Sequence, residues 1–201
     1  MKLRDLARKS WYCTVGYVSS KECVERLERY LLYNLNVLKQ FKGLVSSTTY
    51  KDHDTELMKS VDMMWKRYFP YSVSIHNGVS RGHSFGACDN DDAVFNFCKD
   101  NSIEWMCKSA NDVILSESVL DFDVTEVDFY YLNGIGYGGM EKYGFDFDFI
   151  TSRDFYPQTN FYFINVSKCD FLNDRSHVEE VYDTVSKDPS YNGRAWEYGF
   201  R

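Results

Sequence analysis

Apolar residues along residues 11–107 follow two different periods, and these alternate along the chain. Short segments rich in aromatic and β-branched residues are separated by longer segments in which apolar residues recur every three or four positions. The first pattern predicts strands, and the second predicts helices with one buried face. We expect strands over residues 11–18, 44–49, 71–75 and 103–107. This alternation favours an α/β fold with a mainly parallel sheet flanked by helices.

Local signals place the starts and ends of the intervening helices. Ser19 and Glu22 have the spacing of a capping box, and Asp54 can cap a second helix that Pro70 ends. A third helix is expected to open at Asp89, after a polar, glycine-containing loop. Each helix would then connect two neighbouring strands as a βαβ crossover.

The alternation stops after residue 120. Residues 127–132 and 159–166 are strand-like, and a helix is expected after Ser176. The stretch between the two strands, NGIGYGGMEKYGFDFDFITSRDFYP, has no helical period. Its length and its many aromatic rings are typical of a functional loop rather than of a disordered segment. No linker or repeat interrupts the chain, so we expect a single compact domain over residues 1–201.

Composition narrows the classes of partner. The formal charge of −7 and a pI near 5.1 argue against binding to nucleic acid or to an anionic membrane, because both require a basic face. The sequence shows neither the apolar core of a signal peptide nor an apolar run of ~18 residues, so we expect a cytoplasmic protein without a transmembrane segment. The six cysteines form no C-x-x-C pair and are expected to be reduced core residues.

Polar residues gather where the predicted parallel strands end, which is the edge of such sheets at which ligands bind. They offer cations for phosphate charge, glycines for close backbone approach, and amides and hydroxyls for hydrogen bonds. This combination suits a nucleotide, although Arg81 alone is also typical of a solvated surface and Gly86 of a turn. The candidate nucleotide-binding residues are Gly16, Tyr17, Asp52, Asn77, Arg81, Gly86, Lys108 and Asn111.

Asp112 follows the strand expected at residues 103–107, where a charge needs a partner. It is either a ligand of a divalent cation or the N-cap of a helix formed by the segment VILSESVL. The chain contains no G-x-x-x-x-G-K-[ST] motif, and its first strand leads into VSSKE rather than G-x-G-x-x-G. These observations argue against a P-loop NTPase and an NAD enzyme, and a nucleotidyltransferase is disfavoured because VSSKEC is not a glycine-rich basic loop.

The order of these elements resembles the GT-A nucleotide-sugar glycosyltransferases of the family-2-like type, over roughly residues 11–170. In that family a loop similar to N-x-G-x-x-x-A-R-N-x-G precedes a helix, and a D-A-D-D step follows the fourth strand. Asn77, Arg81 and Gly86 match the loop, and residues 109–112, SAND, match the acidic step. The stretches NGIGYGG and DFYPQTNFYFI also resemble small predicted glycosyltransferases of marine phages.

The resemblance implies a Rossmann-like GT-A fold with a nucleotide-binding half at residues 11–120 and an acceptor-side half at residues 121–201. It implies transfer of a sugar from a nucleotide diphosphate sugar, with a UDP-sugar favoured, to the hydroxyl of a carbohydrate or another acceptor. If the protein is viral, it would act in the host cytoplasm. Arg81 and Lys108 would help to neutralise the leaving diphosphate.

The resemblance also implies roles for residues outside the nucleotide site. Asn111 and Asp112 would bind Mn²⁺ or Mg²⁺, at reduced affinity because Ser109 and Asn111 replace two carboxylates of the D-A-D-D step. Glu197 is the first candidate for the catalytic base and Asp154 the second. Asn133 and Gln158 would bind sugar hydroxyls. The lost carboxylates leave an alternative open, namely a catalytically degenerate domain that binds a nucleotide or sugar or has a structural role.

Overall fold

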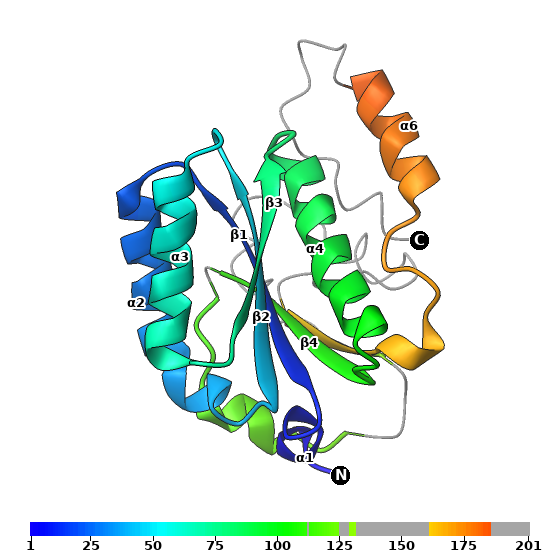
Figure 1. Ribbon diagram of the computed structural model, residues 1–201. Coiled ribbons are helices and arrows are strands. Elements are labelled where there is room, and N and C mark those ends of the chain that lie inside the picture. The colour runs from blue at the N-terminus through cyan, green and yellow to red at the C-terminus, as the bar shows by residue number, and fades with distance from the viewer. Residues whose placement is uncertain (112, 125–128, 132–160, 186–201) are drawn as a thin grey trace, which may run out of the picture.

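The computed structural model describes residues 1–111, 113–124, 129–131 and 161–185 (Figure 1). Six strands in this part of the chain form one sheet in the order β3-β2-β1-β4-β6-β5. The strands are β1 (Trp11–Val18), β2 (Gly43–Tyr50), β3 (Val73–Val79), β4 (Trp105–Ala110), β5 (Phe129–Tyr131) and β6 (Phe161–Asn165).

The four N-terminal strands are parallel to one another, as the alternation of the sequence predicts. β1 is central and pairs with β2 on one side and with β4 on the other. Strand β6 runs antiparallel to both β4 and β5, so the sheet is mixed at one side. The predicted α/β class with a mainly parallel sheet between helices is confirmed.

Helices cover both faces of the sheet. Figure 1 shows α2 and α3 on one face and α4 on the other, with α6 beside α4. The helical elements are α1 (Leu3–Ala7), α2 (Lys21–Leu38), α3 (Thr55–Tyr68), α4 (His83–Asp100), α6 (Arg175–Val185) and the short 3₁₀ segments η1 (Glu117–Asp121) and η4 (Val166–Lys168). None of the helices in the described part of the chain is long and apolar enough to cross a membrane.

Strand residues alternate between two hydrophobic clusters, one on each face of the sheet. Tyr12 and Leu44 pack with α2 and α3, whereas Cys13 and Val45 pack with α4. This alternation follows from the period of two along a strand. It also decides which strand-end side chains can face the same helix, and so which can share a site.

Several boundaries differ from the sequence prediction. Strand β4 spans Trp105–Ala110 rather than residues 103–107. Strand β3 runs on to Val79, and α4 begins at His83 rather than at Asp89. Gly82 provides the turn between them with φ 109°, a conformation that glycine adopts without strain. The apolar residue Phe85 is buried and extends the inward face of α4 by one turn before Asp89. The glycine-rich composition of this segment concealed the early start of the helix.

The local signals around α3 are confirmed, whereas two others are wrong. Asp54 accepts hydrogen bonds from the amides of Glu56 and Leu57, and α3 ends before Pro70. The capping box at Ser19 is wrong, because Ser20 is the N-cap of α2 and makes no side-chain cap bond. Residues 113–116 are not helical, so the alternative expectation of a helix that starts directly after Asp112 is also wrong.

Candidate functional site

The pairing of β1 with β4 stops where β4 ends, and a ligand site can form beside the start of α2 at this edge of the sheet. The last residue pair between these strands is Val15 with Ala110, whereas β1 remains paired with β2 as far as Val18. Here the chain changes the side on which it adds strands: β2 and β3 lie on one side of β1, and β4 lies on the other. Such a switch point in a parallel sheet is the position at which ligands bind in α/β proteins.

A cavity of ≈ 280 Å³ lies at this switch point. Tyr17 comes from the end of β1 and Asn111 from the residue after β4. Three further wall residues come from the first two turns of α2. Together they offer an aromatic ring, a cation, an amide, a thiol and an aliphatic group, a mixture that is typical of small-molecule sites. The wall is formed by Tyr17, Cys23, Arg26, Leu27 and Asn111.

Gly16 allows the two strand ends to approach each other. A Cβ atom at this position would lie 2.8 Å from Asn111 Nδ2 and 3.8 Å from Leu27 Cδ2. The first of these distances is too short for a carbon atom, so any larger residue would displace the amide of Asn111. The structure therefore brings three of the predicted nucleotide-binding residues together: Gly16, Tyr17 and Asn111.

Cys23, one of the cavity residues, has a distinct chemical state. Burial raises the pKa of its thiol, but hydrogen bonds from Ser19, Ser20 and Arg26 outweigh burial and lower the pKa from 9.0 to about 6. Arg26 Nη2 lies 3.1 Å from Cys23 Sγ, and the two serine hydroxyls each lie 3.5 Å from it. The serines at the start of α2 thus stabilise a thiolate instead of capping the helix. The Cys23 thiol is therefore more acidic than an ordinary cysteine thiol.

Sequence reasoning missed Cys23 and Arg26. The cysteine was assigned to the core along with the other five, and it is indeed only 8% exposed. A usable signal was present, because α2 begins directly after β1 and its first turns must therefore lie at the carboxyl edge of the sheet. Ser19 and Ser20 precede Cys23, and Arg26 follows it by three residues; donors and cations placed in this way lower the pKa of a thiol.

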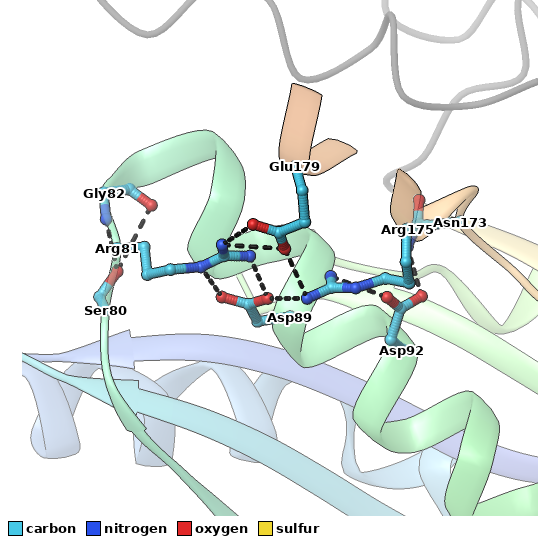
Figure 2. A network of polar contacts seen from close by, with 8 residues as sticks. All are labelled: Ser80, Arg81, Gly82, Asp89, Asp92, Asn173, Arg175 and Glu179. Atoms are coloured by element: carbon cyan, nitrogen blue, oxygen red, sulfur yellow. Dashed lines mark hydrogen bonds and ion pairs between the residues drawn. The ribbon is translucent and has the colours of Figure 1, made fainter. Parts of the chain in front are cut away.

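Arg81 is held by carboxylates on the side of α4 (Figure 2). Its guanidinium donates to both oxygens of Asp89 at 2.6 and 2.8 Å and to both oxygens of Glu179 at 2.8 and 3.0 Å. It also lies over the rings of Tyr182 and Phe85, with its Cζ atom 5.0 and 5.9 Å from the ring centres. Hydrogen bonds from Arg81 to Asp89 are the main reason that the pKa of Arg81 is raised. Arg81 is not among the residues that line the cavity.

Arg175 extends this network and fixes α6 to α4 (Figure 2). It donates to Asp89 at 2.9 Å, to Asp92 at 2.9 Å and to Glu179 at 3.2 Å. Asn173 adds a hydrogen bond of 2.7 Å to Asp92. The two acidic residues that the sequence suggested as a helix start therefore bind the C-terminal helix.

Lys108 lies inside the fold, on the face of the sheet that packs against α4. Its Nζ atom is 3.4 Å from Asp91 Oδ1 and 5.7 Å from the ring centre of Tyr162. Burial raises the pKa of Asp91 to about 6, although the charge of Lys108 opposes the shift. This pair explains why β4 carries a lysine between buried residues, and it directs the cation away from the α2 side of the sheet.

The remaining described candidates lie near the same edge but outside the cavity wall. Asp52 is exposed after the end of β2, and Asn77 is half-buried in β3. Gly86 lies in the first turn of α4, where a Cβ atom would come within 2.5 Å of Ser80 Oγ. Gly86 therefore allows α4 to pack closely on the loop that follows β3. Five predicted site residues lie outside the described part of the chain: Asp112, Asn133, Asp154, Gln158 and Glu197.

The predicted metal site is described only at Asn111. An amide oxygen is a ligand that hard divalent cations accept, and the Asn111 side chain lines the cavity, so this position fits the expected ion. Across residues 1–111, 113–124, 129–131 and 161–185, no group of three histidine, cysteine, aspartate or glutamate side chains could hold a metal. A metal at this site would therefore depend on Asp112 and on ligand oxygens.

Comparison with known proteins gives a similarity to solved structures but none to a known sequence family. No protein-family model matches the sequence, and no curated protein does. The chain is similar to the crystal structure of galactosyltransferase LgtC in complex with donor and acceptor sugar analogs, with a TM-score of 0.47 and 12% sequence identity. The match covers 86% of this chain and 66% of the length of that chain.

Proposed function

We propose that this protein is a glycosyltransferase that uses a nucleotide diphosphate sugar, with a UDP-sugar favoured, and transfers the sugar to an acceptor hydroxyl. The observation that carries the proposal is the cavity between the carboxyl ends of β1 and β4, lined by Tyr17, Arg26 and Asn111. The sequence resemblance supplies the reaction class, and the cavity supplies a place for the nucleotide.

The cavity residues have properties that suit a nucleotide diphosphate. Tyr17 is 48% exposed, so its ring is available to stack on a base, a contact worth about 1–3 kcal/mol. Arg26 is exposed and places a guanidinium at the cavity, where it would bind phosphate oxygens. In a chain with a net charge of −7, such a local cation is needed to attract an anionic ligand.

The remaining roles are proposals for residues beyond the described part of the chain. Asp112, with Asn111, would hold Mn²⁺ or Mg²⁺, which would offset the charge of the leaving diphosphate. Glu197 or Asp154 would accept the proton of the acceptor hydroxyl. Asn133 and Gln158 would bind hydroxyl groups of the sugars.

One observation favours the alternative, a degenerate domain that binds a nucleotide or sugar without transfer. Ser109 stands where the D-A-D-D step has its first carboxylate, and its side chain is fully buried. Tyr30 donates to the Ser109 hydroxyl at 3.3 Å, and that hydroxyl donates to the carbonyl of Ala110 at 3.1 Å. The Ser109 side chain is therefore buried beside Tyr30 and is not among the residues that line the cavity.

Calorimetric titration of UDP with and without Mn²⁺ tests the nucleotide site. For the wild-type chain we expect binding that Mn²⁺ strengthens. Asp112→Asn keeps the size of the side chain but removes its charge, so metal-dependent affinity should fall strongly, while Asn111→Asp should tighten Mn²⁺ binding. Asp100→Asn, in the last turn of α4, is the control and should leave affinity unchanged. Unchanged affinity in Asp112→Asn would contradict the metal role.

A matched pair at Tyr17 tests the place of the base. Tyr17→Ala removes the ring and should weaken UDP binding by about tenfold, whereas Tyr17→Phe keeps the stacking surface and should bind almost as well. Tyr71→Ala removes an exposed ring elsewhere and should have no effect. Hydrolysis of UDP-, GDP- and CMP-sugars then separates a transferase from a binding domain, because only an enzyme releases the nucleoside diphosphate or monophosphate.

A further inference from the structure

Two buried asparagines bind the two strand ends that form the cavity. Asn34 lies in α2 and Asn90 in α4, so they approach the sheet from opposite faces. Asn34 is fully buried and Asn90 is 2% exposed. A buried amide lowers stability unless both its NH₂ group and its oxygen form hydrogen bonds. Both groups of each of these side chains form hydrogen bonds.

Asn34 binds the backbone that follows the predicted metal ligands. Its Nδ2 atom donates to the carbonyl of Val113 at 2.9 Å, and its Oδ1 atom accepts from the amide of Leu115 at 2.6 Å. Residues 113–116 belong to no helix or strand that would otherwise pair these groups. The side chain of one helical residue therefore holds the chain where it leaves β4.

Asn90 binds the end of β1 in a similar way. Its Nδ2 atom donates to the carbonyl of Gly16 at 3.0 Å and to Thr49 Oγ1 at 3.3 Å. Its Oδ1 atom accepts from Ser47 Oγ at 2.7 Å. Gly16 lies directly after the last residue of β1 that pairs with β4. Asn90 therefore provides a hydrogen-bond partner at the point where the pairing of β1 with β4 stops.

We infer that Asn34 and Asn90 are positioning residues that fix the separation of the β1 and β4 ends and thereby the shape of the cavity. Gly16 and Asn111 are the facing groups, and their close approach depends on both backbone segments staying in place. Asparagine suits this role because it is the shortest side chain with a separate donor and acceptor. The effect on nucleotide binding rests on the proposed function, whereas the effect on the cavity does not.

The rate at which Cys23 reacts with a small disulfide reagent reports on the cavity without any assumption about the ligand. In a Cys169→Ser background we expect Cys23 to be the reactive thiol, because Cys98 is buried and burial raises the pKa of Cys13, Cys88 and Cys107. Asn34→Leu and Asn90→Leu remove donor and acceptor while keeping the number and branching of the side-chain heavy atoms. Each should change the Cys23 rate and lower UDP affinity by about tenfold, and the Asn→Asp variants should lie between these and the wild type.

Val61→Ala, in the core of α3, is the matched control for lost stability. It should lower the melting temperature as the asparagine variants do, yet leave the Cys23 rate and UDP affinity unchanged. If Asn34→Leu and Asn90→Leu lower the melting temperature in the same way without altering either readout, both residues are merely structural and the inference is wrong. If the Cys23 rate changes but the wild-type chain binds no UDP, the positioning role stands and the proposed function fails.

If the leucine variants do not fold, variants that disturb the structure less can test the same inference. Ser47→Ala removes a single hydrogen bond to Asn90 and introduces no charge. Amide exchange at Leu115 reports directly on the bond to Asn34, and the Asn34→Asp variant keeps an acceptor for that amide. Faster Cys23 modification in Ser47→Ala supports the inference, and an unchanged rate together with unchanged UDP affinity contradicts it.

Discussion

Removing the positive charge beside Cys23 should shift the pH at which this thiol reacts. Burial raises the pKa of Cys23, but hydrogen bonds from Ser19, from Ser20 and from Arg26, in decreasing order, lower it from 9.0 to about 6; Arg26 Nη2 is 3.1 Å from the sulfur. Arg26→Gln keeps a hydrogen-bond donor but removes the charge. Because a neighbouring opposite charge shifts a pKa by about 1–3 units, the midpoint should rise from about 6 to about 7 or higher.

The midpoint of the pH profile distinguishes a lowered pKa of Cys23 from an ordinary one better than the reaction rate at a single pH does. At pH 7 a thiol with a pKa of about 6 is ~90% thiolate, compared with ~1% for a pKa of 9. The less basic thiolate is also a weaker nucleophile, by roughly 15–30-fold for a difference of ~3 units. The net gain in rate at pH 7 is therefore only about 3–6-fold, which other effects of burial could mask.

Alkylation by iodoacetamide, followed by mass spectrometry from pH 4 to pH 9, measures the midpoint. The Cys169→Ser background leaves Cys23 as the reactive site, and Lys21→Gln is a control that removes an exposed positive charge from the same helix end. We expect midpoints near pH 6 for the wild type and for Lys21→Gln, and a higher midpoint for Arg26→Gln. A wild-type midpoint near 8.5, or one that Arg26→Gln does not move, would refute the account of the thiolate.

Three further predictions follow from the buried and close-packed groups. Burial raises the pKa of Asp91 from 3.8 to about 6. The contribution of Asp91 to stability is therefore complete below pH 4 and declines by up to about 3 kcal/mol as the pH rises through 6. Urea unfolding across this pH range should show the decline, and Asp91→Asn should make the stability less dependent on pH. Gly16→Ala should displace Asn111 and weaken UDP binding in calorimetry, and equal affinity would disprove the close approach. Glu179→Gln removes one carboxylate from Arg81, so amides of α6 should exchange about tenfold faster at low salt, and an unchanged rate would mean that the ion pair does not hold the helix.

The sheet could be predicted from sequence because its strands obey a local rule. β1 and β2 are buried on both faces and consist of short runs of aromatic, β-branched and small residues between amphipathic helices. The order of such segments predicts parallel crossovers without any knowledge of distant contacts. The start of α4 could not be predicted in this way, because the inward position of Phe85 depends on contact with Tyr182, which lies 97 residues later in the chain.

The candidate site was predicted in part for the same reason. Gly16, Tyr17 and Asn111 were found because parallel strands end at a common edge, which is a consequence of topology. Arg81 was grouped with them on that argument, but its two carboxylate partners come from helices, one of them 98 residues away. No local pattern distinguishes an arginine that binds a ligand from one that binds another helix.

Burial distinguishes the polar residues at the end of β4. Ser109 is buried against Tyr30 of α2, whereas Asn111, two residues later, lines the cavity beside the start of the same helix. A carboxylate at position 109 would be buried in a site where Tyr30 and the backbone satisfy only a hydroxyl, and this costs several kcal/mol. Serine is therefore the residue that packing requires there, whereas position 111 faces the cavity and accepts either an amide or a carboxylate. The fold thus explains why position 109 carries no carboxylate, and the proposed cation site rests on Asn111 and Asp112.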